Sequence, residues 1–343
     1  MSDASAERDQ PALLRGDPFD DRLRETVHPS GWTNPVPRGR YQLVVVGAGT
    51  AGLVTAAVAA GIGARVALVE RSLMGGDCLN VGCVPSKAVL RAARAWAEAR
   101  AAQGRFGAPA VEGDGDFAAA MARMRSLRAS IAPVDGAARF RDLGVDVYLG
   151  EARFTAPDAV TVGGATLAFR RAVVATGARA AVPDIPGLAD VAYHTNETVF
   201  TLTRRPAHLV ILGAGPVGCE LAQAFARFGS RVTLLDRGAR VLENDEPEAS
   251  AVVERALAAD GVRVVHGARV ARVAPRGDAH DVHLASPTVE TLECDALLVA
   301  TGRAPNVLGL GLEAAGVRFD PARGVAVDDR LRTSNPRIYA VGD

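Results

Sequence analysis

One pattern occurs twice along these 343 residues, and it constrains the fold more than any other feature. An apolar strand leads into a glycine-rich turn, a helix of small residues follows, and a second strand ends in an acidic residue. The first copy starts at the strand of residues 42–46 and ends at Glu70; the second starts at residues 208–212 and ends at Asp236. In each copy the acid lies 23 residues after the first glycine, from 47 to 70 and from 213 to 236. This order is typical of a dinucleotide-binding unit, so the repeat predicts two dinucleotide sites on one chain.

Each turn carries three glycines at equivalent positions, namely Gly47, Gly49 and Gly52 in the first and Gly213, Gly215 and Gly218 in the second. The first glycine permits a sharp bend, and the second lets backbone N–H groups approach a pyrophosphate at the helix N-terminus. The third allows the helix to pack closely. The acid at the end of each unit, Glu70 or Asp236, would accept hydrogen bonds from ribose hydroxyls.

A second feature is the cysteine pair Cys78 and Cys83, five positions apart at the start of an alanine-rich helical segment. A disulfide needs Cα atoms roughly 4.4 to 6.8 Å apart, whereas five residues of regular helix rise about 7.5 Å. The segment between the cysteines is therefore expected to be bent, and Asn80 and Gly82 tolerate unusual backbone angles. A thiolate near a helix N-terminus would be stabilised there, with the cation of Lys87 one turn beyond Cys83. The pattern favours a redox-active disulfide.

Two other interpretations of the pair stay open from the residues alone. Nearby cysteines are often buried small hydrophobic residues. A zinc site is less favoured, because structural zinc ligands usually lie two to four residues apart and recur downstream. Cys219 and Cys294 form no such second pair, and no metal is predicted.

The stretch Gly75-Gly-Asp-Cys-Leu-Asn-Val-Gly-Cys-Val-Pro-Ser-Lys87 resembles the signature of the flavoprotein disulfide reductases. This family includes dihydrolipoamide dehydrogenase, glutathione reductase and mercuric reductase. The resemblance extends from about Tyr41 to Asp343 and has one departure, because Asp77 occupies the position where the family usually has threonine. An additional carboxylate there would raise the thiol pKa values and disfavour a thiolate.

The resemblance implies the cofactors and the roles of several residues. The first site would hold FAD and the second the nicotinamide cofactor, and electrons would pass from NAD(P)H through FAD to the Cys78–Cys83 disulfide. Cys83 would be the thiol nearest the flavin and Cys78 the interchange thiol that meets the substrate. Lys87 would pair with Glu220 near the flavin. Further cofactor contacts are expected at Gly76, Thr176, Gly177, Gly302, Arg303, Gly342 and Asp343.

The nicotinamide site gives two opposing indications of specificity. Asp236 favours NADH, because a carboxylate pairs with the 2′-hydroxyl and repels a 2′-phosphate. Arg237 and Arg240 could instead bind the phosphate of NADPH. NADH is the expected cofactor, and NADPH is the alternative.

Composition restricts the class of partner. The chain has 39 basic and 39 acidic residues, so its charge gives no reason to expect a nucleic-acid or membrane partner, and a small-molecule substrate is expected. The N-terminus lacks the apolar core of a signal peptide, and no run of 18 apolar residues follows, which predicts a cytoplasmic protein. Residues 1–40 are polar and carry five prolines, and they are predicted to form a mobile tail.

The expected fold is α/β, with two Rossmann-like domains in three layers, mostly parallel sheets, and the second domain inserted into the first. The predicted boundaries are 41–190 for the first part of the FAD-binding domain, 191–307 for the NAD(P)-binding domain and 308–343 for the return of the FAD-binding domain. Members of the resembled family continue with a dimerisation domain that donates a His-Glu pair to the interchange thiol. The chain ends at Asp343 and is expected to be a fragment without that domain, from a homodimer.

The predicted function is that of an FAD-dependent pyridine nucleotide-disulfide oxidoreductase. Its substrate would be a dithiol or disulfide, as for dihydrolipoamide dehydrogenase, or Hg(II), as for mercuric reductase. An NADH oxidase or quinone reductase, in which the disulfide does not matter, is the alternative enzyme. A non-catalytic nucleotide-binding fragment is the alternative outside catalysis. Replacement of Cys78 by serine would separate the two enzymes, and flavin binding would test the third hypothesis.

Overall fold

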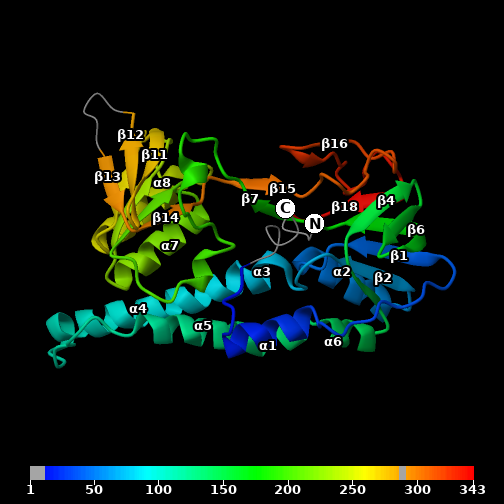
Figure 1. Ribbon diagram of the computed structural model, residues 1–343, viewed down its shortest axis with the longest axis horizontal. Coiled ribbons are helices and arrows are strands. Elements are labelled where there is room, and N and C mark those ends of the chain that lie inside the picture. The colour runs from blue at the N-terminus through cyan, green and yellow to red at the C-terminus, as the bar shows by residue number, and fades with distance from the viewer. Residues whose placement is uncertain (1–11, 286–290) are drawn as a thin grey trace. The chain divides into compact units, whose positions relative to one another are not determined.

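The computed structural model describes residues 12–285 and 291–343, and the chain divides into two compact units (Figure 1). Within the described residues, unit 1 comprises the chain up to Val84, Arg125–Arg179 and Arg303–Asp343. Unit 2 comprises Pro85–Met124 and Ala180–Gly302. Each unit contains a parallel sheet. The α/β class and the insertion of a second Rossmann-like unit into the first are therefore confirmed.

The sheet of unit 1 is built around the first predicted nucleotide-binding unit. Its parallel strands lie in the spatial order β3 (Asp146–Leu149), β2 (Val66–Glu70), β1 (Tyr41–Val46), β6 (Ala165–Val174) and β18 (Ile338–Ala340). Two more strands extend the sheet. β5 (Ala159–Val162) pairs antiparallel with the first half of β6, and β4 (Ala152–Ala156) pairs antiparallel with β5. The strand near the end of the chain, β18, thus pairs with β6, as the predicted return of the first domain requires.

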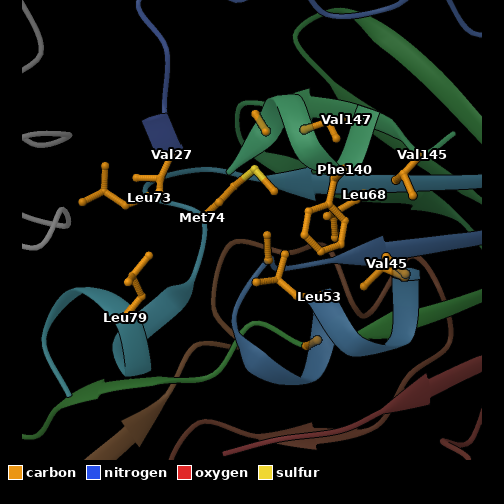
Figure 2. Packing of buried hydrophobic residues seen from close by; sticks show 14 of the residues in the cluster. Val27, Val45, Leu53, Leu68, Leu73, Met74, Leu79, Phe140, Val145 and Val147 are labelled. Atoms are coloured by element: carbon orange, nitrogen blue, oxygen red, sulfur yellow. The ribbon is translucent and has the colours of Figure 1, made fainter. Parts of the chain in front are cut away.

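Side chains of this sheet alternate between two hydrophobic clusters, one on each face. Val45 and Leu68 belong to a cluster that includes residues of α1 (Pro18–Val27), α2 (Thr50–Gly61) and α6 (Ala137–Asp142) (Figure 2). Val44 and Val69 belong to the other cluster, with residues of β4, β5 and the 307–317 segment. The third layer of unit 1 is therefore formed by strands and loops rather than by helices.

The remaining elements of the unit 1 segments are short, apart from two helices that continue into unit 2. The short elements are α3 (Gly76–Asn80), η2 (Ala132–Val134), β7 (Ala178–Ala180), β15 (Arg303–Pro305), β16 (Phe319–Asp320) and β17 (Gly324–Val325). The two long helices are α4 (Cys83–Phe106) and α5 (Phe117–Ile131).

Unit 2 repeats the nucleotide-binding pattern. Its parallel sheet has the order β10 (Arg263–Val265), β9 (Arg231–Leu235), β8 (His208–Leu212) and β14 (Ala296–Val299). The helices are α7 (Pro216–Arg227) and α8 (Pro247–Ala259), with the short helices η3 (Leu188–Asp190) and η4 (Val199–Thr201). An antiparallel sheet of β11 (Val270–Arg276), β12 (Ala279–Leu284) and β13 (Thr291–Cys294) completes the unit.

The helical segment that follows the cysteines packs on unit 2, which differs from the predicted boundaries. Trp96 of α4 lies edge-on to Phe228 with ring centroids 4.9 Å apart. Phe117 of α5 contacts Phe225 and Phe228 at centroid distances of 5.8 and 5.4 Å. Residues 85–124 were predicted to belong to the FAD-binding domain, but these aromatic contacts place them with the second unit.

The structure also corrects the prediction that residues 1–40 form a mobile tail, over the part that it describes. Asp17 caps α1 by accepting hydrogen bonds from the backbone N–H groups of Phe19 and Asp20. Leu23 and Val27 are completely buried in the core of unit 1. The segment contributes apolar surface to that core, which offsets the entropy of ordering it. Residues 1–11 of the predicted tail lie outside the described residues.

Candidate active site

The first glycine turn has the close contacts that a dinucleotide site requires. Gly47 has a φ of +104°, and a Cβ on it would lie 2.2 Å from the carbonyl oxygen of Ala175. A Cβ on Gly52 would lie 1.8 Å from the carbonyl oxygen of Gly47. Both positions therefore need glycine. Gly49 begins α2 as its N-cap without a side chain, which leaves the first N–H groups of the helix available to a phosphate.

Glu70 closes this turn from the end of β2. Its Oε2 accepts a hydrogen bond from the backbone N–H of Ala48 at 2.7 Å, and its Oε1 accepts one from Ser72 at 2.8 Å. Burial raises the pKa of Glu70, while these two backbone hydrogen bonds oppose the change. Each carboxylate oxygen keeps a second lone pair, so the residue can still accept a ribose hydroxyl. The turn and its acid therefore fit the adenosine and pyrophosphate of a dinucleotide.

The second turn reproduces this geometry almost atom for atom. Gly213 has a φ of +100°, and a Cβ on it would lie 2.4 Å from the Ala300 carbonyl oxygen. A Cβ on Gly218 would lie 1.9 Å from the Gly213 carbonyl oxygen, and Gly215 is the N-cap of α7. Asp236 accepts hydrogen bonds from the backbone N–H groups of Ala214 at 2.5 Å and Gly238 at 2.6 Å. The second turn therefore also fits a dinucleotide.

The two arginines that follow Asp236 have different surroundings. Arg240 donates from Nη2 to the carbonyl oxygens of Glu243 and Asp245 at 2.5 and 2.8 Å, so that nitrogen holds a loop. Arg237 is exposed. A Cβ on Gly238 would lie 2.7 Å from Oε2 of Glu243 and 3.0 Å from Oδ1 of Asp236. Two carboxylates therefore flank Gly238, and one of them, Glu243, was not predicted from the sequence.

The two predicted redox cysteines lie on either side of a break between helices. Cys78 belongs to α3, and α4 begins at Cys83. The break is tight at Gly82, where a Cβ would lie 2.8 Å from the carbonyl oxygen of Asp77. Asn80 stabilises α3, because its side chain donates to the carbonyl oxygens of Gly76 at 2.8 Å and Met74 at 3.1 Å. The predicted bend between the cysteines is confirmed.

Both cysteines are free thiols in the structure, and they interact with each other. Burial raises the pKa of the Cys78 thiol, and a hydrogen bond with Cys83 raises it further. A hydrogen bond with the hydroxyl of Thr50, the first residue of α2, lowers the pKa of Cys78, whereas the charge of Asp135 raises it. The Cys78 thiol therefore lies at the first glycine turn. Its pKa is raised, in contrast to the stabilised thiolate that helix position alone had suggested.

Asp77 is paired with an arginine. Its Oδ2 lies 2.5 Å from Nη2 of Arg303, and Nε of Arg303 lies 3.2 Å from Oδ2 of Asp343. Arg303 also donates to the carbonyl oxygen of Ala178 at 2.9 Å. The extra carboxylate beside Cys78 is thus compensated by a cation. Asp135, which the sequence analysis had not singled out, is the carboxylate that raises the pKa of Cys78.

The pairing expected for Lys87 and Glu220 is present within unit 2. Nζ of Lys87 lies 2.7 and 2.9 Å from the two carboxylate oxygens of Glu220. The side chains are 62% and 36% exposed, so water screens the pair and its contribution to stability is small. The Lys87–Glu220 pair is a candidate for function because Lys87 lies one helical turn after Cys83, and not because the pair is strong.

Four of the predicted cofactor residues line a cavity of about 200 Å³ in unit 1. Thr176 and Gly177 line one part of it, and Gly342 and Asp343 line another. Thr176 is held by Asn306, because its hydroxyl donates to the Asn306 carbonyl oxygen at 2.8 Å and its own carbonyl oxygen accepts from the Asn306 amide at 3.0 Å. Gly76, with a φ of +54°, lies close to Gly49, and Gly302 of unit 2 has a φ of +147°.

The chain matches the pyridine nucleotide-disulphide oxidoreductase family over residues 41–343. This chain belongs to that family. It is 36% identical over 304 residues to the mercuric reductase of Lysinibacillus sphaericus, an alignment that covers 88% of this chain and 56% of the relative. It is 35% identical over 305 residues to the glutathione reductase of Burkholderia cepacia, covering 88% of this chain and 66% of the relative.

Among solved structures, this chain resembles the HOCl-induced flavoprotein disulfide reductase RclA of Escherichia coli, with a TM-score of 0.77 and 31% identity. That alignment covers 88% of this chain and 66% of the neighbour. The chain spans about half the length of the curated mercuric reductases it matches. The family is FAD-dependent and uses NAD(P)H, which confirms the predicted cofactors at the level of the family.

Between residues 12 and 285 and between 291 and 343, no three histidine, cysteine or acidic side chains cluster as they would around a metal ion. Over the same ranges, no helix has the length and apolar character needed to cross a membrane.

Proposed function

We propose that this protein passes electrons from NADH through FAD to the Cys78–Cys83 pair and then to an acceptor that reacts at sulfur. One observation carries the proposal. The Cys78 thiol interacts both with Cys83 and with Thr50 at the start of α2, so the dithiol lies at the glycine turn that fits FAD. A pair of buried hydrophobic cysteines would not need this position, and Cys83 is exposed.

The residues of the chain divide the work. When bound, FAD supplies a two-electron carrier between a nicotinamide and a disulfide. The Cys78–Cys83 bond breaks as the pair takes up two electrons and two protons, and two thiols form. Cys83 is proposed to lie nearest the flavin, and Cys78 to attack the acceptor as a thiolate. Glu220 is proposed to orient the ammonium group of Lys87, whose positive charge would lie near the reduced flavin.

The proposed domains follow the two glycine turns. Residues 41–190 and 308–343 would bind FAD, and residues 191–307 would bind the nicotinamide cofactor. Support comes from the two hydrophobic clusters of unit 1 and the separate cluster of unit 2. Three stretches are exceptions to these boundaries. Residues 85–124 and 180–190 belong to unit 2, and residues 303–307 belong to unit 1. A homodimer is proposed for the whole protein, by analogy with its family.

NADH is proposed as the reductant because two carboxylates, Asp236 and Glu243, flank Gly238. A 2′-phosphate at that position would meet both negative charges, and Arg240 holds loop carbonyls instead. We expect NADH to bind at least about tenfold more tightly than NADPH. Glu243→Gln should reduce that ratio about threefold, whereas Glu248→Gln, an exposed control in the next helix, should leave it unchanged. Tighter binding of NADPH by the unmodified chain would contradict the assignment.

The acceptor is proposed to be either a disulfide or a thiol-bound soft metal ion such as Hg(II). The names of the relatives, glutathione reductase and mercuric reductase, represent these two chemistries. Both need a thiolate that reaches the substrate. Oxidation of NADH in the presence of lipoamide, glutathione disulfide or Hg(II) would identify the acceptor of the whole protein.

The decisive experiment is an anaerobic addition of NADH to the flavin-loaded chain, followed by acid quenching and thiol counting by alkylation. The proposal expects two new thiols, at Cys78 and Cys83, for each NADH consumed. Cys78→Ser should abolish this change while the flavin is still reduced. If NADH reduces the flavin but no new thiols form, the protein is instead an oxidase or quinone reductase of the same fold.

A further inference from the structure

The segment that carries Cys78, here called the redox segment (residues 73–83), packs against a part of the chain that precedes the family match. The match begins at residue 41, whereas α1 ends at Val27. Val27 nevertheless lies in the same hydrophobic cluster as Leu73, Met74 and Leu79, which flank Cys78 in the sequence (Figure 2). The carbonyl oxygen of Val27 also accepts a hydrogen bond from the backbone N–H of Met74 at 3.4 Å.

A buried ion pair connects α1 to α5. Nη2 of Arg128 lies 2.5 Å from Oδ1 of Asp20, and the two side chains are 0% and 1% exposed. The other oxygen of Asp20 accepts a hydrogen bond from the backbone N–H of Leu14 at 2.8 Å. Arg128 is the largest completely buried side chain among the described residues. A charge in such a position is retained only when it is paired, so α1 is necessary for Arg128.

Arg128 in turn holds the backbone between the cysteines. Its Nη1 donates to the carbonyl oxygen of Asn80 at 2.5 Å. Asn80 is the last residue of α3, two positions after Cys78, where the chain turns toward Cys83. A carbonyl at the end of a helix has no partner within the helix, so an external donor fixes its direction. A second pair, Arg125 with Asp17 at 2.8 Å, fastens α1 to α5 one turn away.

We infer that α1 is a positioning element of the dithiol, acting through Asp20, Arg128 and the carbonyl group of Asn80. The inference builds on the proposed function, because it concerns how closely the two sulfur atoms are held. An anchored Asn80 carbonyl keeps Cys78 and Cys83 at a high effective concentration for each other, which favours the disulfide. Asp20 and Arg128 touch neither sulfur, and they are therefore positioning residues.

The test separates this role from folding. In the double variant Asp20→Leu with Arg128→Met, apolar side chains replace the buried pair, a change that is often tolerated, but Asn80 loses its donor. The thiol–disulfide equilibrium of Cys78 and Cys83 is measured in glutathione buffers by mass spectrometry, and the melting temperature is measured in parallel. We expect the equilibrium to shift about fivefold toward the dithiol, the size expected for one lost hydrogen bond, in a folded protein.

Asp21→Asn is the matched control, because this exposed acid is the next residue of the same helix, and it should leave the equilibrium unchanged. Asp20→Asn with Arg128→Met keeps the shape of the first side chain and still removes the donor to Asn80, and it replaces the first double variant if that one does not fold. A wild-type equilibrium in a folded variant would overturn the inference, as would a loss of folding in both variants, which would make the pair a structural support alone. If the unmodified chain forms no Cys78–Cys83 disulfide at all, the proposed function fails and the inference fails with it.

Discussion

At the scale of single residues, burial separates the four cysteines into two classes. Cys219 and Cys294 are buried, and burial raises the pKa of each to about 12. Cys78 is half-buried, and burial raises its pKa, whereas Cys83 is exposed. Since the thiolate is the reacting form, the first two thiols are inert in the folded protein.

We therefore predict that iodoacetamide, added to the reduced native chain at about pH 8, modifies Cys78 and Cys83 and spares the other two cysteines. Mass spectrometry of tryptic peptides identifies the labelled positions. Unfolding in guanidinium should expose all four cysteines and serves as the control. Rapid labelling of Cys294 in the native protein would contradict the burial of β13.

The acid Asp135 gives the reactivity of Cys78 a defined pH dependence. Its negative charge raises the pKa of the Cys78 thiol, and burial raises the pKa of Asp135 itself. Asp135→Asn removes that charge, so the pKa of Cys78 should fall and its alkylation near pH 7 should become about threefold faster. Alkylation rates across pH measure the effect. Asp142→Asn, which changes an exposed acid of α6, should give the wild-type profile, and slower alkylation of the Asp135 variant would contradict the sign.

Arg303 compensates the carboxylate of Asp77 beside Cys78, and its removal should reveal that charge. In Arg303→Gln, the unpaired Asp77 should slow alkylation of Cys78 near pH 7 about threefold, because a nearby negative charge disfavours the thiolate. The double variant with Asp77→Asn should return to the wild-type rate. If the double variant alkylates as slowly as Arg303→Gln, Arg303 acts through Asp343 or Ala178 and not through Asp77.

At the scale of elements, one helical pair is held to its unit by aromatic side chains. α4 and the first half of α5 contact α7 and its C-terminal flank through Trp96, Phe117, Phe225 and Phe228. Phe106, at the end of α4, is 82% exposed and takes no part in the core. The two aromatic residues of α4 thus provide a matched pair for mutation.

Trp96→Ala should lower the free energy of unfolding by about 2 kcal/mol, since a half-buried indole loses its contact with Phe228. Phe106→Ala should change it by less than about 0.5 kcal/mol. Denaturant unfolding followed by circular dichroism measures both. Equal effects of the two substitutions would show that α4 is not fastened at Trp96.

At the scale of the whole molecule, the two nucleotide-binding units have separate cores. A substitution that damages one glycine turn should therefore abolish binding of one cofactor and spare the other. A side chain at Gly52 or at Gly218 would collide with the carbonyl oxygen of the first glycine of its own turn, at 1.8 or 1.9 Å from the Cβ. The lesion is therefore confined to one turn.

Gly218→Val is expected to weaken NADH binding at least about 100-fold and to leave the flavin in place. Gly52→Val should do the reverse and yield a colourless protein that still binds NADH. Flavin absorbance and calorimetric titration with NADH give the two readings. Loss of both cofactors in either variant would contradict the independence of the units.

The two nucleotide-binding units could be predicted from the sequence because their determinants are local. Glycine at the first and third positions of each turn is required by contacts within a few residues or with the adjacent strand. The acid at the end of the second strand is fixed by the length of the unit. For the same reason, the strand of residues 208–212 has the predicted bounds. The bend between the cysteines followed from the geometry of a disulfide.

The features that were not predicted from the sequence involve residues whose partners are distant in the sequence. Asp20 and Arg128 are 108 positions apart, and Asp77 and Arg303 are 226 positions apart. A local signal for α1 was present, because Asp17 followed by Pro18 is a helix start, but nothing nearby indicated that the helix would be buried. The effect of Asp135 on Cys78 likewise depends on a contact that no local pattern encodes.

The sequence by itself determined the family, the two glycine turns, the bend between Cys78 and Cys83 and the α/β class, since each depends on short-range sterics or on an ordered series of elements. Only the tertiary structure decided which charges compensate one another around Cys78, that residues 85–124 pack on the second unit, and that α1 packs in one cluster with Leu73, Met74 and Leu79. Those outcomes depend on desolvation and pairing between distant residues. The free energy of a buried charge is set by its folded surroundings and not by its neighbours in the chain.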